Sequence, residues 1–241
     1  MAIFTRRRSQ AEIFDDFDWW NKGCFLNQMT GERCDYIESC INRVFGKGAL
    51  QQQEILEVGC GGGLICERLA QRGVVMFGID PARRALDLAR DHALQSGLGH
   101  TIYYQQGAAE ALPYADGSFS TIICFDVLEH VRDLQATIGE IARVLAPGGV
   151  FIFDTINRTL LARAVLIWYG EHFPSGGLQR GIHNYHDFIK PIELRGVLTT
   201  SGLQVRELTG FMPRGLVHGR FKMGPGWFMG VSYVGFATKG A

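Results

Sequence analysis

The sequence predicts one α/β domain built on an open, mostly parallel β-sheet with helices on both faces. At 241 residues, 46% of them hydrophobic and 20% charged, the chain is long enough to bury one large core. Short apolar runs alternate with helix-like stretches, which is typical of strands joined by right-handed helical crossovers. We therefore expect a single domain over residues 1–241 with a seven-stranded, mostly parallel sheet.

Five apolar runs are predicted strands of the core, and two more follow near the C-terminus. The helical stretch before the fifth run stops at the sequence PGG, a strong helix-ending signal. The predicted strands cover residues 54–59, 74–80, 101–106, 120–126, 150–156, 203–211 and 227–240. Around them we expect a helical lid segment (1–50), a cofactor-binding core (51–156), a substrate-side insertion forming a cap (157–200) and the last strands (201–241).

The charge balance and the cysteines narrow the class of protein. Lys plus Arg and Asp plus Glu both number 24, so no basic field is present to attract nucleic acid. The six cysteines form no C-x-x-C pair, and no apolar segment has the length of a secretory signal or a membrane span. We expect free thiols, a cytoplasmic protein and a small-molecule partner.

A glycine-rich loop, EVGCGGG at residues 57–63, follows the first predicted strand and precedes a helix. Gly59 and Gly61 allow the backbone to turn and to approach a ligand closely. Position 64 is Leu, where a dinucleotide-binding fingerprint requires its third glycine. The loop therefore disfavours NAD as the cofactor.

Acidic and small residues support a different nucleoside ligand. Asp80 ends the second strand, at the spacing from which an acid binds ribose hydroxyls. Glu57 directly precedes the glycines and suits a cationic amino-acid moiety better than a phosphate. Ala108 and Ala109 follow the third strand and are small enough to flank an adenine ring. Together these residues favour S-adenosylmethionine.

The segment DVLEHV at residues 126–131 follows the fourth predicted strand. If it turns helical, Asp126, Glu129 and His130 stand at positions i, i+3 and i+4 and share one face, where they could bind a divalent ion. In the alternative, Glu129 caps or pairs locally and His130 hydrogen-bonds a backbone carbonyl. The residues themselves leave both interpretations open.

With these motifs in view, the chain resembles the class I S-adenosylmethionine-dependent methyltransferases, which have a Rossmann-like fold. The broad resemblance rests on LEVGCGGG, GIDPA, ALPYADGSFSTIICFDVLEHV and RVLAPGGVFIFDT. More narrowly, DWW, DTINRT, GIHNYHDFIKPIEL and FKMGPGWFMGVSYVGFATK resemble the ubiquinone-pathway O-methyltransferases. The resemblance runs from about residue 15 to residue 239.

The resemblance implies roles for particular residues. It places Arg33, a glycine of the 59–63 loop, Asp80 and Phe125 against the cofactor. In metal-dependent members of the family the acids and the histidine after strand four bind Mg²⁺, which corresponds to Asp126, Glu129 and His130 here. Asp126 is one methylene shorter than the glutamate usual at that position. Oxygen ligands suit Mg²⁺, and the histidine would also accept Mn²⁺ or Zn²⁺.

The family further implies methylation of a phenol or catechol oxygen on a quinone precursor. His130, His183 and Tyr185 are candidates to accept a proton from the acceptor or to orient it. Asn157 ends strand five, at the sheet edge where ligands bind in open α/β folds. These four residues are the predicted catalytic set.

Three alternative functions remain at this stage. The chain could methylate an unrelated small molecule such as a specialised metabolite, it could be a non-catalytic nucleotide-binding module, or it could be an NAD-dependent oxidoreductase, an option that Leu64 weakens. The apolar and aromatic stretch LLARAVLIWYGEHF (160–173) could lie at a membrane interface, as a peripheral attachment, or could pack over the active site.

Overall fold

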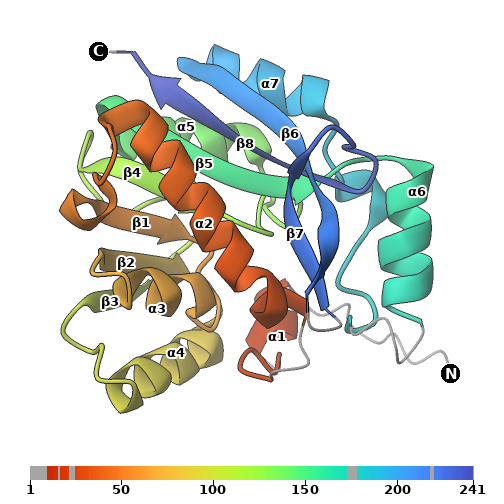
Figure 1. Cartoon of the computed structure of the whole chain (residues 1–241), viewed down its shortest axis with the longest axis horizontal. Coiled ribbons are helices and arrows are strands. Elements are labelled where there is room, and N and C mark those ends of the chain that lie inside the picture. The colour runs from red at the N-terminus through yellow and green to blue at the C-terminus, as the bar shows by residue number, and fades with distance from the viewer. Residues whose placement is uncertain (1–9, 16, 22–24, 173–177, 218–219, 241) are drawn as a thin grey trace, which may run out of the picture.

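A computed structural model describes residues 10–15, 17–21, 25–172, 178–217 and 220–240. Within these residues one eight-stranded sheet runs through the molecule in the order β3-β2-β1-β4-β5-β8-β6-β7 (Figure 1). The strands are β1 (Glu54–Val58), β2 (Val75–Asp80), β3 (Ile102–Gln106), β4 (Phe119–Cys124), β5 (Leu145–Ile156), β6 (Leu203–Val217), β7 (Arg220–Gly226) and β8 (Ser232–Lys239). Strands β1 to β5 pair in parallel, whereas β8, β6 and β7 pair antiparallel.

The predicted class of fold is confirmed, but the predicted number of strands is wrong. The sixth strand continues beyond residue 211 to Val217 and pairs with an additional strand, β7. The sequence of β7, RFKMGPG, contains Gly and Pro and does not read as a strand. Proline is tolerated on an edge strand, where no neighbour needs its missing N–H, and β7 is the edge of this sheet. The last strand begins at Ser232 instead of residue 227.

The helices cover both faces of the sheet (Figure 1). They are α1 (Gln10–Asp15), α2 (Phe25–Phe45), α3 (Leu64–Ala70), α4 (Arg83–Gln95), α5 (Leu134–Val144), α6 (Leu160–Ala162) and α7 (Pro191–Thr200). A π-helix, η2 (Arg163–Gly170), continues α6, and short 3₁₀ turns lie at Leu50–Gln52 (η1) and Tyr185–Asp187 (η4). Among the described helices, none combines the length and the apolar character that a bilayer crossing requires.

Alternating side chains of the strands fill two cores. On β5, Val150 and Ile152 pack with α2, α3 and α4 on one face, whereas Phe151 and Phe153 pack with α5 and α7 on the other. All four side chains are fully buried, and burying each contributes roughly 1.5–3 kcal/mol. This two-sided burial explains why the parallel strands read as continuous apolar runs.

Strand β1 lies at the point where the chain changes direction across the sheet. It pairs with β2 on one side and with β4 on the other. Successive loops after β1 and β4 therefore leave the sheet toward opposite faces and open a crevice at its carboxyl edge. Ligands bind at such switch points in open α/β sheets.

Candidate active site

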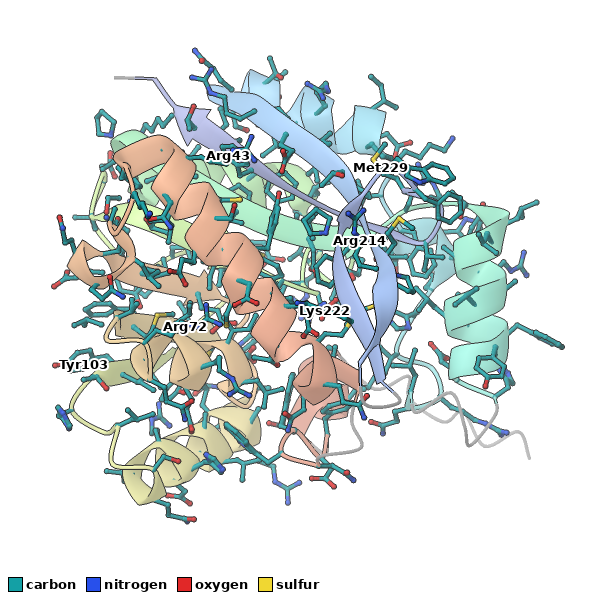
Figure 2. The ribbon with its side chains drawn as sticks, viewed as in Figure 1. Arg43, Arg72, Tyr103, Arg214, Lys222 and Met229 are labelled. Carbon is teal, nitrogen blue, oxygen red and sulfur yellow. The ribbon has the colours of Figure 1, made fainter. Side chains whose placement is uncertain are left out.

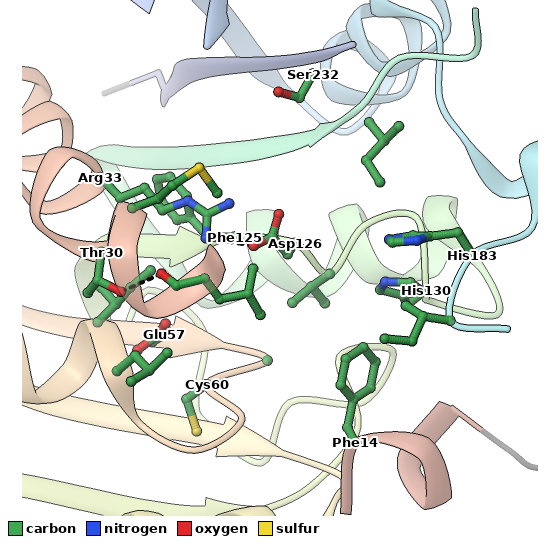
Figure 3. A pocket seen from close by; sticks show the side chains of 18 of the residues that line it. Phe14, Thr30, Arg33, Glu57, Cys60, Phe125, Asp126, His130, His183 and Ser232 are labelled. Atoms are coloured by element: carbon green, nitrogen blue, oxygen red, sulfur yellow. Dashed lines mark hydrogen bonds and ion pairs between the residues drawn. The ribbon is translucent and has the colours of Figure 1, made fainter. Parts of the chain in front are cut away.

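One cavity of about 1120 Å³ occupies this carboxyl edge. Its volume exceeds the roughly 300–1,000 Å³ of an ordinary small-molecule site. The loops after β1 to β4 line one end, and side chains of η2 and of the β6–β7 hairpin line the other (Figure 3). The cavity is large enough for two ligands to lie against each other.

The glycine loop forms the first wall of the cavity. Gly59 and Gly61 have φ angles of +76° and +48°, in the left-handed region that favours glycine. A Cβ atom added to Gly59 would lie 2.2 Å from the Val127 side chain. The backbone N–H of Gly59 donates to the Ile79 carbonyl at 2.7 Å, which ties the loop to the end of β2. The predicted close-approach geometry of the loop is therefore present.

Asp80 supports the loop from the end of β2. Its carboxylate accepts hydrogen bonds from the backbone N–H groups of Gly61 and Ala82, both at 2.8 Å. Burial raises the pKa of Asp80 to about 6, although these two hydrogen bonds oppose the shift. The residue lines the cavity at the position from which it was predicted to bind ribose, and it also fixes the loop backbone.

Glu57 lies at the end of β1 and lines the cavity beside Cys60 (Figure 3). Its side chain is buried, and the Cys66 thiol donates to its Oε2 at 2.9 Å. Burial raises the pKa of Glu57 to about 8. A cation bound beside Glu57 would favour its ionised form, so the site fits the ammonium group of an amino-acid moiety.

An aromatic strap from the N-terminal segment covers the glycine loop. The ring of Trp19 lies against Gly61 and Gly62, so that a Cβ on either glycine would meet it at 2.3 Å. The indole N–H of Trp20 donates to the Gly62 carbonyl at 3.1 Å, and its ring stacks on His92 with centroids 3.4 Å apart. The DWW motif thus forms part of the cavity wall at the glycine loop. The sequence interpretation had assigned this segment only to a lid.

Arg33, from α2, holds two carboxylates at the floor of the cavity. Its guanidinium pairs with Asp126 at 2.6 Å (Figure 3) and with Asp154 at 2.8 Å. Asp154 also accepts from the Asp126 backbone N–H at 2.6 Å. Burial disfavours the charge of Arg33, but its two ion pairs outweigh burial and raise its pKa. Burial also raises the pKa of Asp154, although the nearby Arg33 works in the opposite direction. Arg33 is therefore a permanent cation between two acids.

Sequence reasoning missed Asp154. The signal was available, because Asp154 is an acid in the middle of the otherwise apolar strand VFIFDTI. Its side chain is buried, and buried carboxylates in proteins require a charged or hydrogen-bonding partner. The partner, Arg33, is 121 positions away in the chain, which is why the pair was not visible.

The metal site predicted at Asp126, Glu129 and His130 does not fit the structure. The segment forms a turn, not a helix, because Asp126 has a φ of +55°, so the side chains do not share a helical face. Asp126 is paired with Arg33, and Glu129 accepts from the Thr155 hydroxyl at 2.8 Å outside the cavity lining. Burial raises the pKa of Glu129, which favours its neutral form and weakens it as a ligand.

Metal-ligating groups do not converge elsewhere in the described part of the chain either. No cluster of three or more His, Cys, Asp or Glu side chains there has a geometry that could hold an ion. The five cysteines within the described ranges are buried free thiols, as predicted, and Cys24 lies outside those ranges. The interpretation in which Glu129 pairs locally agrees with the geometry.

Two histidines from distant segments meet in the middle of the cavity. The rings of His130 and His183 stack with centroids 5.5 Å apart, and both point into the cavity (Figure 3). Phe14, from α1, packs its ring edge on His130 at 5.3 Å. Burial, and to a smaller extent the nearby His183, lower the pKa of His130 to about 3, so this imidazole is neutral. The structure thus brings two of the predicted catalytic residues together.

The other two predicted catalytic residues lie elsewhere. The Asn157 amide donates to the Met229 carbonyl at 2.7 Å, and Tyr185 packs against Phe188 beneath the guanidinium of Arg163, 5.5 Å from its ring. Neither Asn157 nor Tyr185 lines the cavity. Asn157 therefore binds the 227–231 loop, and Tyr185 packs within the cap.

The remaining predicted cofactor residues, Ala109 and Phe125, both line the cavity. Phe125 also lies 5.7 Å beneath the guanidinium of Arg33. The cap and the β6–β7 hairpin add apolar side chains to the lining, among them Leu166, Ile182 and Met212. The cavity therefore has a polar end at the glycine loop and an apolar end under the cap.

Comparisons with known proteins agree with this geometry. The methyltransferase-domain family profile matches residues 56–153. A ubiquinone biosynthesis O-methyltransferase from Sinorhizobium medicae is 35% identical, over 87% of each chain. Another with that name, from Agrobacterium fabrum, is 32% identical over 100% of this chain and 98% of its own.

Solved structures agree in fold. A putative sarcosine dimethylglycine methyltransferase from Galdieria sulphuraria aligns with a TM-score of 0.64 at 18% identity, over 86% of this chain and 85% of its own. The magnesium protoporphyrin IX methyltransferase from Synechocystis PCC 6803 aligns with a TM-score of 0.58 at 20% identity, over 87% of this chain and 84% of its own. At such identities the likeness shows the fold alone.

Sheet order, glycine loop and strand-end acids together define an S-adenosylmethionine-dependent methyltransferase of the Rossmann-like class I fold. Within that class, the identity of 32–35% to these two relatives over most of the chain identifies the family. The chain belongs to the family of the ubiquinone biosynthesis O-methyltransferases.

Proposed function

We propose that this enzyme methylates a phenolic hydroxyl of a catechol, carried by a polyprenyl-substituted quinone precursor. The observation that carries the proposal is the continuous cavity, which joins the glycine loop to an apolar end through His130 and His183. The names of the curated relatives support the same acceptor class.

The polar end of the cavity suits the methyl donor. When bound, S-adenosylmethionine supplies a methyl group activated by the positive charge of its sulfur. Gly59 and Gly61 would allow backbone contact with the donor, and Glu57 and Asp80, which line this part of the cavity, would bind its ammonium and ribose groups. Trp19 covers the loop and keeps water from this end. The chain thereby fixes the direction from which the methyl carbon can be attacked.

The acceptor needs a partner for its proton. A phenol has a pKa of about 10 and is mostly neutral at neutral pH, although its anion is the better nucleophile. His183 and His130 line the cavity and stack on each other, so either imidazole could reach an acceptor hydroxyl bound there. Because Asp126 is paired with Arg33, these imidazoles are the groups that accept the proton.

The apolar end suits the tail of the acceptor. Leu166 and Ile182 contribute to the lining from the cap, and Met212 and Met223 contribute from the β6–β7 hairpin. Unbranched methionine side chains adapt to irregular apolar ligands. This lining fits an isoprenoid chain better than a charged group.

Purified enzyme with labelled S-adenosylmethionine and a panel of acceptors tests the proposal. The panel pairs each catechol with and without a prenyl substituent, and adds amines and carboxylates of similar size. We expect turnover on the catechols, a lower KM for the prenylated member of each pair, and no effect of a chelator. Turnover on the amines or carboxylates alone would replace the proposed acceptor with another.

The same proposal includes peripheral attachment to a membrane, where polyprenyl acceptors reside. Trp168 and Trp227 are 64% and 83% exposed. The Asn157 amide and the Thr159 hydroxyl bond the carbonyls of Met229 and Gly230, which hold the 227–231 loop beside α6 (Figure 2). Exposed aromatic side chains favour the interface of a bilayer.

Charge favours an anionic surface, because the β6–β7 hairpin that borders the same cavity carries exposed Arg214 and Lys222 (Figure 2). Flotation with phosphatidylglycerol vesicles measures the attachment. We expect the double variant Trp168→Ser, Trp227→Ser to leave the vesicle fraction, and Leu94→Ser, a control at an exposed position on α4, to stay with it. Wild-type protein that remains entirely in solution would remove this part of the proposal.

A further inference from the structure

A buried carboxylate that the proposed function does not use lies behind His183. Glu171 follows the π-helix η2, is 5% exposed and does not line the cavity. It accepts hydrogen bonds from the backbone N–H groups of Gly181 at 2.7 Å and His183 at 2.9 Å, and it meets His183 Nδ1 at 3.0 Å. One side chain thus fixes both the backbone and the imidazole of the residue that faces the acceptor.

The contact decides which nitrogen of His183 is free. Burial works to raise the pKa of Glu171, but its hydrogen bonds with His183 and Gly181 more than offset burial and lower the pKa. Glu171 is therefore ionised and can only accept, so Nδ1 of His183 carries the proton. In the neutral ring the lone pair is then on Nε2, which has no hydrogen-bond partner among the described residues. The His183 side chain is only 9% exposed.

Packing holds the ring in this orientation. His130 stacks on one side at 5.5 Å, and Phe188 meets the ring at 5.9 Å in an edge arrangement. Because the pKa of His130 is lowered, the stacked partner is a neutral ring. The two histidines are therefore not equivalent, since His183 alone is hydrogen-bonded to a carboxylate.

We propose that Glu171 is a positioning residue that sets His183 as the general base of methyl transfer. Nε2 of His183 takes the proton of the acceptor hydroxyl. The oxygen lone pair forms the O–C bond to the methyl carbon while the C–S bond breaks, and its electron pair goes to sulfur. Glu171 stabilises the resulting imidazolium. This inference rests on the proposed function, because it requires an acceptor with an ionisable hydroxyl.

The test compares Glu171→Gln with wild type on two catechols. One has an ordinary phenol pKa, and the other carries a nitro group and is already ionised at the assay pH. Glutamine retains an acceptor oxygen for Gly181, but its amide can donate to Nδ1 and select the wrong tautomer of His183. We expect kcat on the ordinary catechol to fall ~100-fold or more. KM and the Kd for S-adenosylmethionine should stay within about threefold of wild type.

On the nitrocatechol the loss should shrink below about tenfold, because no proton needs to be removed. His183→Asn should show the same dependence on the acceptor. Glu207→Gln is the matched control, because Glu207 also bonds two side chains, Tyr36 and Arg43, but outside the cavity lining. It should change kcat on neither acceptor.

The outcomes separate the two levels of the proposal. If wild type methylates neither catechol, the proposed function fails and the role of Glu171 fails with it. If wild type is active and Glu171→Gln loses nothing, or loses equally on both catechols, Glu171 is merely structural and the inference alone is overturned. A selective loss on the ordinary catechol supports it.

Discussion

The two ends of the cavity are built by different means. At the donor end, strand termini and a glycine loop present backbone groups, and the buried acids Glu57, Asp80 and Asp154 lie within the sheet edge. At the acceptor end, apolar side chains come from η2 and the β6–β7 hairpin, and loops are tied to each other by hydrogen bonds from Asn157 and Thr159. The donor end is therefore formed by the sheet edge and its buried acids, whereas the acceptor end depends on hydrogen bonds between loops.

This difference teaches where function can tolerate change. A charge removed from the donor end leaves its partner buried, which costs more than the removal of one hydrogen bond at the acceptor end. Loss of a paired charge at the donor end should therefore lower both folding stability and donor binding. At the acceptor end it should change acceptor binding while donor binding persists.

The largest effect is expected for Arg33→Met, which leaves Asp126 and Asp154 without their cation. Breaking a buried ion pair from one side costs about 3–5 kcal/mol of the free energy of unfolding. Arg83→Met is the control, because Arg83 pairs with Asp87 on the surface at 4.0 Å and should matter by about 0.5 kcal/mol or less. Urea unfolding measures both. A loss below about 1 kcal/mol for Arg33→Met would show that the two acids do not need their partner.

Gly59→Ala should weaken donor binding next most strongly. Its φ of +76° disfavours alanine, and the new Cβ would meet Val127 at 2.2 Å, so the loop must move. We expect the Kd for S-adenosylmethionine to rise by ~100-fold, measured by calorimetry. Gly48→Ala has a similar φ of +81° but open space around it, so it should lose stability without losing binding. Equal Kd values for the two variants would remove the loop from the donor site.

Glu57→Gln should change how stability depends on pH. The pKa of Glu57 is about 8 in the folded protein and about 4.5 when unfolded, so the folded state binds the proton more tightly. The contribution of the protonated carboxyl is complete below the unfolded pKa and is lost as pH rises toward 8. Glutamine cannot ionise, so the free energy of unfolding of the variant, relative to that of wild type, should rise by about 1–2 kcal/mol from pH 6 to pH 8.

Urea unfolding of the ligand-free protein at both pH values measures this gain. Glu54→Gln, at the exposed start of the same strand, is the exposed-carboxylate control. A difference between Glu57→Gln and wild type that stays constant with pH would contradict the buried, protonated carboxyl.

The glycine loop and the position of Asp80 were predicted well because these features are local. The glycine loop and Asp80 are set by the order strand, loop, helix, strand, which a short window of sequence reveals. The arrangement at Asp126 was not predictable, because a residue with φ of +55° looks like any other aspartate in the sequence. The prediction of a shared helical face was wrong because the chain turns at Asp126. The metal site that depended on this face was therefore wrong too.

The acceptor end was predicted less well because its hydrogen-bond partners lie in loops. His183 was recognised as a candidate base, but Glu171 lies 12 positions earlier in a segment read only as apolar and aromatic. Hydrogen-bond partners across a loop depend on how the loop closes, and loop closure leaves no periodic pattern. Asn157 was placed at the correct edge of the sheet, but the direction of its side chain was set by the 227–231 loop.

Asn157 provides the smallest and most discriminating comparison between the two ends. Its amide donates to the Met229 carbonyl at 2.7 Å, so Asn157→Ala should cost about 1 kcal/mol of stability. Asn157→Asp should cost more, because an ionised carboxylate would face that carbonyl oxygen without a proton to donate. Both variants should raise the acceptor KM by several-fold in steady-state kinetics, since the loop that borders the apolar end loosens. The Kd for S-adenosylmethionine should stay at the wild-type value. A loss of donor binding would instead place Asn157 at the donor end, and a loss of kcat alone would place it in the chemical step.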